Sequence, residues 1–228
     1  YCYQMWKCSN PKTARADGAY GQYIIVMPNE DMVAVVTQVI REGKAGRRER
    51  QMLFKDVLGA IKSEALPKSA ADFRLLQKKS ASYVLPYAEG RSAVTSKAVL
   101  NKTFTFDKNA YGWKSVRIVK VGKKLKLFID TEDCGTNEIE CGYRKWTLSE
   151  VATKFPPNAR GNTKGAFSGF TSPFKASASY GWTRDGKLNV KVLYVDWMSG
   201  VKLQFDFVQN QMTLQENYKS KASLLRFK

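Results

Sequence analysis

The residue types that perform most hydrolytic chemistry are unevenly represented in this chain, which contains no histidine. A Ser-His-Asp triad, a Cys-His pair and any histidine-ligated zinc site are therefore excluded within its 228 residues. Serine chemistry that uses lysine and tyrosine as bases needs no histidine and stays open. Its signature is S-x-x-K at the start of a helix, because side chains three residues apart share one helix face.

The S-x-x-K pattern does occur, but never where a helix is predicted to begin. Ser9–Lys12 and Ser172–Lys175 each contain a proline, and Ser199–Lys202 runs from a turn into a strand. So short a pattern also arises by chance in a lysine-rich chain. The relay motifs Y-x-N and S-x-N are absent from the sequence. We therefore expect the nucleophilic serine and its lysine and tyrosine bases to lie outside this chain, upstream of it.

A glycine-flanked apolar hairpin is the most informative stretch of the sequence. Two apolar strands are predicted at Tyr20–Met27 and Met32–Thr37, joined by a tight turn at Pro28–Asp31. Strands that are apolar on both faces are typical of the interior of a sheet. Gly18 and Gly21 bracket the start of the first strand and predict a close approach to that backbone.

With the preceding segment Tyr1–Trp6 and a basic amphipathic helix after it, this hairpin resembles the end of the catalytic domain in β-lactamase-related serine hydrolases. These include class C β-lactamases, penicillin-binding D-peptidases, esterases and nylon-oligomer hydrolases. The resemblance implies hydrolysis of an amide or ester bond in a small-molecule or peptide substrate, through an acyl-serine intermediate and without cofactor or metal. It also implies a periplasmic or extracytoplasmic location. The first residue is Tyr1 rather than Met, so we expect a fragment that lacks the N-terminal part of its protein.

The resemblance also places one wall of the catalytic cleft, which other members build from a K-T-G strand. Here the wall falls on Ala16-Asp17-Gly18, and neither Lys nor Thr is present, which disfavours β-lactam hydrolysis more than ester or peptide hydrolysis. A backbone N–H near Gly18 or Ala19 is expected to donate to the developing oxyanion, and Arg15 to pair with a substrate carboxylate. The alternative is a hairpin whose glycines only permit tight packing. The candidate substrate-binding residues are Arg15, Ala16, Asp17, Gly18, Ala19 and Gln22.

The formal net charge of +18 raises the question of nucleic-acid binding. The basic residues are scattered, however, and their densest runs, Arg47–Arg50, Lys78-Lys79 and Lys123–Lys126, are short. A solvated basic surface is therefore favoured, nucleic acid is not expected, and anionic cell-surface polymers are a further partner class. No run of about 18 apolar residues occurs, so no membrane-spanning helix is expected.

Three other groups of residues invite a chemical interpretation. The cysteines Cys2, Cys8, Cys134 and Cys141 lack zinc-site spacing, and both local disulfides, above all Cys134–Cys141 across a turn, and free thiols stay open. Acidic residues at 130–133 would suit glycosidase or metal chemistry, but a solvated turn is the commoner arrangement. Aromatic residues would suit either a ligand cavity or, more commonly, a packed core; they are Trp113, Trp146, Tyr180, Trp182, Tyr194 and Trp197.

The elements that must position these residues fall into an α+β arrangement. Residues 1–62 are expected to form the last antiparallel strands (1–8, 20–27 and 32–40) and the closing helix (46–62) of a β-lactamase-like transpeptidase fold. The helix should pack through Met52, Leu53, Val57, Leu58 and Ile61. Residues 63–97 are expected to be a connector with a short helix at Ala70–Lys79.

From residue 98 the apolar period changes to two, which predicts an antiparallel β-barrel, described as lipocalin-like in relatives, or a sandwich over 98–228. The hairpin at Asp185-Gly186 is its strongest turn signal, and the surrounding W-x-x-D-x-x-L resembles a hairpin of that accessory domain. Residues Glu132–Pro173 are expected to be irregular. The predicted strands are Thr103–Phe106, Val116–Val121, Lys124–Ile129, Ala176–Trp182, Leu188–Val195, Val201–Phe207, Met212–Gln215 and Ser223–Phe227.

A second hypothesis belongs to a different functional class. The chain would be a non-enzymatic β-barrel binding module whose basic surface takes an anionic polymer or nucleic acid, with residues 1–62 as a packing subdomain. Under the first hypothesis the N-terminal strands lack the rest of their sheet, so an exposed apolar edge and aggregation of the isolated chain are expected.

Overall fold

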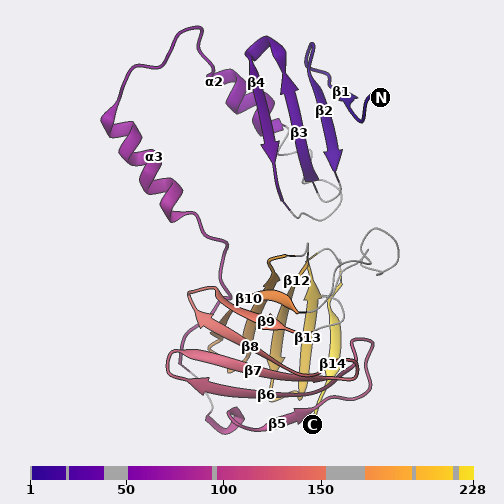
Figure 1. Ribbon diagram of the computed structural model, residues 1–228. Coiled ribbons are helices and arrows are strands. Elements are labelled where there is room, and N and C mark those ends of the chain that lie inside the picture. The colour runs from indigo at the N-terminus through magenta and orange to yellow at the C-terminus, as the bar shows by residue number, and fades with distance from the viewer. Residues whose placement is uncertain are drawn as a thin grey trace. The chain divides into compact units, whose positions relative to one another are not determined.

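The computed structural model describes residues 2–18, 21–38, 51–93, 97–152, 173–196, 199–217 and 221–228. The protein is mostly β, with 50% of its residues in strands and 16% in helices. It divides into two compact units, Tyr1–Leu85 and Pro86–Lys228, and Figure 1 shows the strands of each. The division falls inside the segment 63–97 that the sequence marks as a connector.

The N-terminal unit contains a four-stranded antiparallel sheet in the order β1-β2-β3-β4. The turn before β4 is a short 3-10 helix, Pro28–Glu30, followed by Asp31 in the left-handed region, which confirms the predicted turn. The strand predicted at 1–8 is wrong over most of its length, because only Trp6–Lys7 forms a strand there, and a strand that the sequence does not predict, Ala14–Gly18, pairs with β3. The strands are β1 (Trp6–Lys7), β2 (Ala14–Gly18), β3 (Gln22–Met27) and β4 (Met32–Val36).

One face of this sheet is covered by the helix that follows it. The described helical residues comprise a π-helical turn, Leu53–Val57, and α2, Leu58–Ala60. Buried Ile25 and Met27 pack against Leu53 and Leu58. The predicted apolar face was partly wrong: a π turn bonds residue i to i+5, so it aligns positions 53 and 58 rather than following the 3.6 period. Phe54 packs inward, whereas Met52 and Val57 are exposed, and Ile61 is exposed because it lies beyond the end of the helix at Ala60.

The opposite face of the same sheet is apolar and open. Ile24, Val33 and Val35 are exposed by 48%, 60% and 64% respectively. These side chains alternate along each strand with the buried ones. The composition of the strands predicts burial on both faces, but only one face is buried. The sequence predicts exposed apolar residues at the edge of this sheet. The structure shows them on one face of the sheet as well.

The connector contains the predicted helix. Helix α3 spans Ala70–Ser82, and Ser69 caps it by accepting a hydrogen bond from the Asp72 N–H at 3.2 Å. All 13 of its residues are exposed, so α3 contributes nothing to a core among the described residues.

The C-terminal unit is a ten-stranded sheet that curls into a half-barrel. In Figure 1, strands β6–β8 cross in front of β12–β14 at a steep angle, which shows the curl. The strand order is β14-β13-β12-β11-β10-β8-β7-β6-β5, and β9 pairs with β10. A short 3-10 helix, Lys97–Val99, precedes the first strand. The strands are β5 (Thr103–Thr105), β6 (Trp113–Val121), β7 (Lys124–Thr131), β8 (Gly135–Tyr143), β9 (Thr147–Val151), β10 (Phe174–Trp182), β11 (Leu188–Tyr194), β12 (Ser199–Asp206), β13 (Gln211–Glu216) and β14 (Ser223–Arg226).

The eight predicted strands of this unit are confirmed, but two more lie in the stretch expected to be irregular. Strand β8 was missed because glutamates occupy its outward positions and only Ile139 and Cys141 are buried apolar residues on its inward face. Strand β8 also pairs in parallel with β10 over a short segment, so the sheet is not purely antiparallel as predicted. The return through β9 reverses the chain before β10, which makes the parallel pairing possible.

The two ends of the sheet meet at Phe106 and Phe227, which form an isolated antiparallel bridge. Next to it, the backbone N–H and C=O of Thr105 bond those of Lys228, both at 2.9 Å. Side chains fill the interior: Tyr180 and Trp182 are 0% and 1% exposed. The expectation that aromatic residues pack in a core is confirmed for these two, and Trp197 lies outside the described residues.

A segment that we call the strap, Pro86–Arg91, crosses the outer face of β10 and fixes the start of the unit to it. Arg91 and Trp182 exchange backbone hydrogen bonds of 2.8 and 2.9 Å, and the Ala88 N–H donates to buried Ser179 Oγ at 2.9 Å. The crossing is so close that a Cβ on Gly181 would lie 2.4 Å from the Glu89 carbonyl oxygen. Glycine at 181 is therefore required by the contact of two backbones.

We expect Gly181→Ala to lower the free energy of unfolding of the C-terminal unit by roughly 1–3 kcal/mol, because the new methyl group must displace the strap. Urea unfolding followed by tryptophan fluorescence measures this loss. Lys175→Ala, at an exposed position on the same strand, is the matched control and should change stability by less than about 0.5 kcal/mol. Equal stability of the two variants would show that the crossing tolerates a side chain.

The turn between β12 and β13 is held by Asp206. Its Oδ1 accepts hydrogen bonds from the N–H groups of Val208 and Gln209 at 3.1 and 3.0 Å, and its Oδ2 pairs with Lys187 at 3.2 Å. Burial opposes ionisation, but these hydrogen bonds and the lysine charge prevail and lower the pKa of Asp206.

Because the pKa of Asp206 is lower in the folded state, its contribution to stability is present above the unfolded pKa of about 3.9 and is lost as the pH falls through the folded pKa. Asp206→Asn should therefore cost about 1 kcal/mol at neutral pH, and the difference from the wild type should shrink in acid. Unfolding curves between pH 7 and pH 2.5 test this. The exposed Asp133→Asn should give a pH profile parallel to the wild type.

Candidate functional site

The predicted cleft wall lies on strand β2, where its residues alternate between the two faces of the sheet. Arg15 and Asp17 point to the face covered by the helix, and Ala16 and Gly18 to the open apolar face. Arg15 Nε lies 3.0 Å from Asp17 Oδ2, and its Nη1 donates to Cys8 Sγ at 3.4 Å. These contacts, the bond to Cys8 first, raise the pKa of Arg15. The site residues are thus neighbours in the chain whose side chains do not converge on one point.

The close approach predicted by the glycines is made by the hairpin itself. A Cβ on Gly18 would lie 2.8 Å from the Gln22 Cβ, and Gly21 has a φ of +84°. The amides of Gln22 and Gln38 bond backbone carbonyls across the strand ends, that of Gln38 to Gly21 at 2.8 Å. Ala19 lies outside the described residues. Tight packing therefore accounts for Gly18 by itself, as the alternative interpretation of this hairpin predicts.

The outer edge of β2 is open along the predicted wall. Strand β1 pairs only with Ala14 and Arg15, so Ala16–Gly18 has no strand partner on that side among the described residues. An edge of this kind presents backbone N–H and C=O groups to an extended ligand. Among the described residues of the predicted wall, this edge offers backbone groups to which a substrate could bind.

The described S-x-x-K matches do not form a nucleophile and base. Ser9 and Lys12 lie in a turn in which Lys12 has a φ of +53°. Ser199 and Lys202 lie three residues apart on β12, so they point to opposite faces; Ser199 is buried and Lys202 exposed. Ser172 lies outside the described residues.

The cysteines form neither of the local disulfides, Cys2–Cys8 and Cys134–Cys141, that the sequence left open. Cys134 lies at the turn before β8, whereas Cys141 lies near the far end of that extended strand, too far away for a disulfide. Cys141 is fully buried, and burial raises the pKa of its thiol. In the acidic segment, Asp130 lies 3.8 Å from Lys114. Across the part of the chain that the structure describes, no cluster of three or more metal-ligating side chains occurs.

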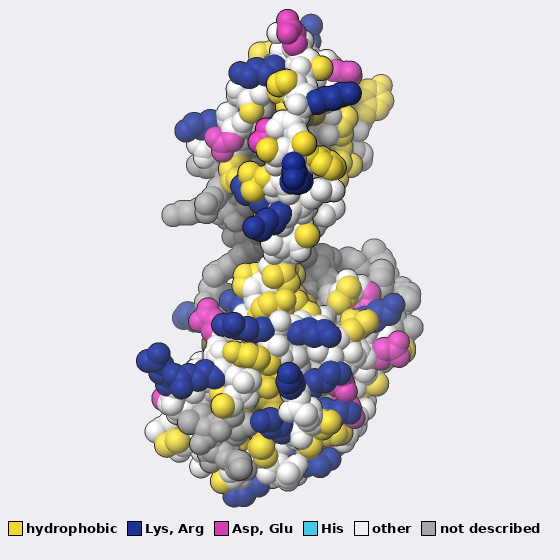
Figure 2. Space-filling view, turned by 90° about the vertical axis from the view of Figure 1, so that its left-hand side faces the viewer, with side chains coloured by type: hydrophobic (Ala, Val, Ile, Leu, Met, Phe, Trp, Pro, Cys, Tyr) yellow, Lys and Arg dark blue, Asp and Glu magenta, His cyan; other side chains and the backbone are white. Residues whose placement is uncertain are grey.

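Two lysines of the basic run Lys123–Lys126 are paired with glutamates of the neighbouring strand β8. Lys124 pairs with Glu140 at 2.7 Å, and Lys126 lies 3.3 Å from the same carboxylate and also contacts Glu138. Figure 2 shows the Lys and Arg side chains spread over this side of the C-terminal unit rather than gathered in one stripe. The described basic residues of β7 therefore form ion pairs within the sheet.

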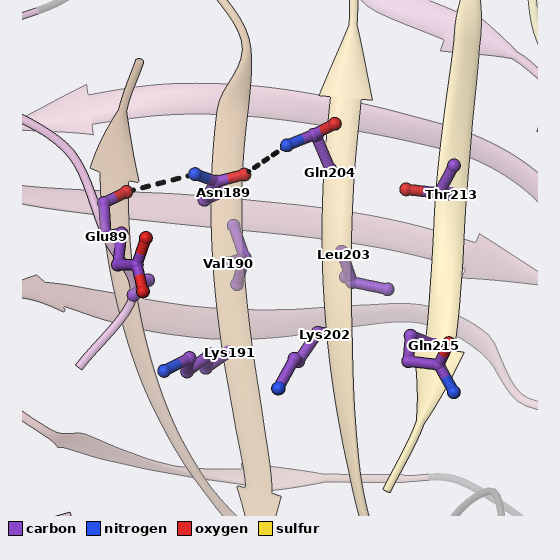
Figure 3. Close-up of a pocket in the computed structure, with 10 residues that line it drawn as sticks. Glu89, Asn189, Val190, Lys191, Lys202, Leu203, Gln204, Thr213 and Gln215 are labelled. Carbon is purple, nitrogen blue, oxygen red and sulfur yellow. Dashed lines mark hydrogen bonds between the residues drawn. The ribbon is translucent and has the colours of Figure 1, made fainter. Parts of the chain in front are cut away.

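A polar groove that the sequence does not predict lies on the outer face of β11–β13, beside the strap (Figure 3). Its cavity volume is about 310 Å³. Outward-pointing residues of the three strands form two rows across it, and we call it the lysine groove. One row is Lys191, Lys202 and Gln215, and the other is Asn189, Gln204 and Thr213.

The residues of this groove are polar residues that alternate with apolar ones along each strand. Only the register of the strands shows that they lie side by side. Lys191 and Lys202 are adjacent because the antiparallel register of β11 and β12 places them directly opposite each other. Asn189 Nδ2 donates to the Glu89 carbonyl at 3.1 Å, and Gln204 Nε2 donates to Asn189 Oδ1 at 2.8 Å. The strap therefore orients one of the two rows.

Comparison with known proteins found no matching protein family, no similar curated protein and no similar solved structure. Among the described helices, none is long and apolar enough to cross a membrane. The geometry of the edge of β2, the open face beside it and the lysine groove therefore carries the functional argument.

We expect the open face of the N-terminal sheet to cause self-association. The double variant Val33→Thr, Val35→Thr replaces two exposed valines by isosteric, β-favouring residues and should shift the chain towards monomer without loss of folding. Sedimentation velocity across a concentration series measures the shift. Val121→Thr, at an exposed valine of the C-terminal unit, should leave association unchanged; a double variant that associates like the wild type would contradict the expectation.

Proposed function

We propose that the N-terminal unit is one wall of the active site of a β-lactamase-related serine hydrolase, which cleaves an amide or ester bond through an acyl-serine intermediate. The reactive serine and its lysine and tyrosine bases come from a part of the protein encoded upstream. A substrate runs along the edge of β2 at Ala16–Gly18, as an added strand. A backbone N–H near Gly18 or Ala19 donates to the oxyanion as it forms.

The observation that supports this proposal is an open edge next to an open apolar face. The edge at Ala16–Gly18 has unpaired backbone groups among the described residues, and Ile24, Val33 and Val35 form the exposed apolar surface of the same sheet. A sheet covered by a helix on one face and left apolar on the other needs a second layer to complete a core. In the proposed enzyme that layer is the catalytic part, and it brings the nucleophile to the edge of β2.

We also propose a fold family for each unit and a cellular location for the enzyme. The N-terminal sheet and its helix are the end of a β-lactamase-like transpeptidase fold, and the curled C-terminal sheet is the lipocalin-like accessory domain of such an enzyme. The substrate is a small molecule or peptide, no cofactor is required, and the enzyme acts in the periplasm or another extracytoplasmic space.

The geometry refines the roles of the predicted residues. Arg15 and Asp17 lie on the helix-covered face and bond each other, so they hold β2 in place from behind. Ala16 and Gly18 lie on the open face, where small side chains leave room for the substrate. Arg15 pairing with a substrate carboxylate would require its bonds to Asp17 and Cys8 to break.

The test is to express the complete reading frame that contains this chain and to treat it with a fluorophosphonate probe. We expect one labelled serine, in an S-x-x-K motif upstream of residue 1, and no label on residues 1–228 alone. An unlabelled full-length protein, or a reading frame without that motif, would overturn the proposal.

A matched pair of variants then tests the wall. Ala16→Val and Ala14→Val make the same change on the same strand and face, but Ala14 is paired with Lys7 whereas Ala16 borders the open edge. Ala16→Val should lower kcat/KM of the full-length enzyme by roughly 10–200-fold, and Ala14→Val should leave it within about twofold. Equal effects of the two variants would remove the edge of β2 from the site.

The second hypothesis, a binding module with a broadly basic surface for nucleic acid or another anionic polymer, gains no support from β7. Its lysines are paired with Glu138 and Glu140, and Val116–Lys126 lacks the regularly spaced aromatic residues of a stacking platform.

A further inference from the structure

Two lysines of the lysine groove face each other, and the one carboxylate that lines the groove, that of Glu89, forms no ion pair with either of them among the described residues. Lys191 and Lys202 are directly opposite in the antiparallel pair β11–β12, where Cβ atoms lie about 4.5–5.5 Å apart and like charges are destabilising. Lys191 Nζ donates to the carbonyls of Pro86 and Tyr87, at 3.0 and 2.8 Å, which fixes its position but brings no negative charge. Within the described part of the chain, no carboxylate forms an ion pair with either lysine.

Other lysines of the same sheet show what a compensated arrangement looks like. Lys124 and Lys126 each contact a glutamate of the neighbouring strand, and Lys187 contacts Asp206. Burial, and after it the charge of Lys202, lowers the pKa of Lys191, whereas the charge of Glu89 acts in the opposite direction. The groove is thus lined by two lysines and one carboxylate, which leaves an excess of positive charge there.

The described residues that line the groove are rich in hydrogen-bonding groups and include no aromatic residue. The amides of Gln204 and Gln215 and the hydroxyl of Thr213 line the groove, and Figure 3 shows them in two rows beside the lysines. Gln204 is oriented through Asn189 by the strap. Bases and sugar rings are usually held by stacking on aromatic residues, so this lining favours a ligand that is recognised by charge and hydrogen bonds.

We propose that the lysine groove binds an oxyanion with two or more negative charges, of the phosphate or polycarboxylate class, between Lys191 and Lys202. The anion replaces the repulsion of the two ammonium groups by two attractive contacts and accepts hydrogen bonds from the neighbouring amides. This site is independent of the proposed hydrolase wall, because every residue in it belongs to the C-terminal unit.

The experiment titrates the full chain with inorganic pyrophosphate and, separately, with citrate, at constant ionic strength, by isothermal titration calorimetry. Tighter binding of pyrophosphate would assign a phosphate ligand to the groove, and tighter binding of citrate a polycarboxylate. If neither anion binds with a Kd below about 10 mM, the proposal is overturned. Binding should weaken as salt is added, because the groove is open to solvent.

Lys202→Gln is the decisive variant, since Lys202 is exposed and its loss should not disturb the strap. It should weaken binding of the preferred anion at least about tenfold, the size expected for one charged hydrogen bond. Lys120→Gln, at an exposed lysine of β6, removes the same charge and should change the Kd by less than about twofold. Equal weakening by both variants would show a general effect of net charge and overturn the site.

A second measurement follows Lys191 directly by NMR of its side-chain resonances. A bound anion should raise the pKa of Lys191, and Lys202→Gln should raise it without ligand by removing the facing positive charge. Resonances of Lys191 that do not move at saturating anion would place the ligand elsewhere.

Discussion

The register of strands β10–β13 is the constraint on which the C-terminal unit depends. It directs Leu188, Val190 and Val192 into the core, each at most 1% exposed, and therefore directs Asn189 and Lys191 outward. A slip by one residue would bury the lysine and expose the valines, so burial of the core and formation of the polar groove are one event. The groove is thus as well defined as the core beneath it, although it lies on the surface.

The strap adds a second condition to the same sheet. Its backbone lies against Gly181, and its carbonyls bond Lys191 and Asn189 from the side. Hydrogen bonds to the strap already restrict the conformations of the Lys191 side chain. Less conformational entropy is therefore lost when a ligand binds to it. Fixing Lys191 before a ligand arrives is therefore what favours binding there over binding to any other lysine of a basic surface.

Much of this architecture follows from the sequence wherever one physical signal dominates. Alternation with the turn at Asp185-Gly186 predicts β10 and β11 correctly, and Pro28–Asp31 correctly predicts the turn before β4. Strand β8 was missed because its outward glutamates carry no β signal until the lysines of β7 are known to lie opposite them. The helix face was misjudged because a π turn changes the period locally, which no composition reveals.

The two candidate sites also differ in how far they can be predicted from the sequence. The hairpin around Gly18 is local, so its residues can be named from the sequence, but their division between two faces depends on the pairing of β2 with β3. The lysine groove is not local: its lysines lie on different strands and meet only through register.

The charge of the chain is therefore less informative than its placement. A net charge of +18 is spread over many lysines, and on β7 it is cancelled within the sheet by glutamates. Lys191 and Lys202 differ from Lys126 of β7 because the residue opposite each in the pairing of β11 with β12 is the other lysine rather than a glutamate. Like charges that face each other across a sheet are destabilising, so an anion bound between Lys191 and Lys202 would offset that cost.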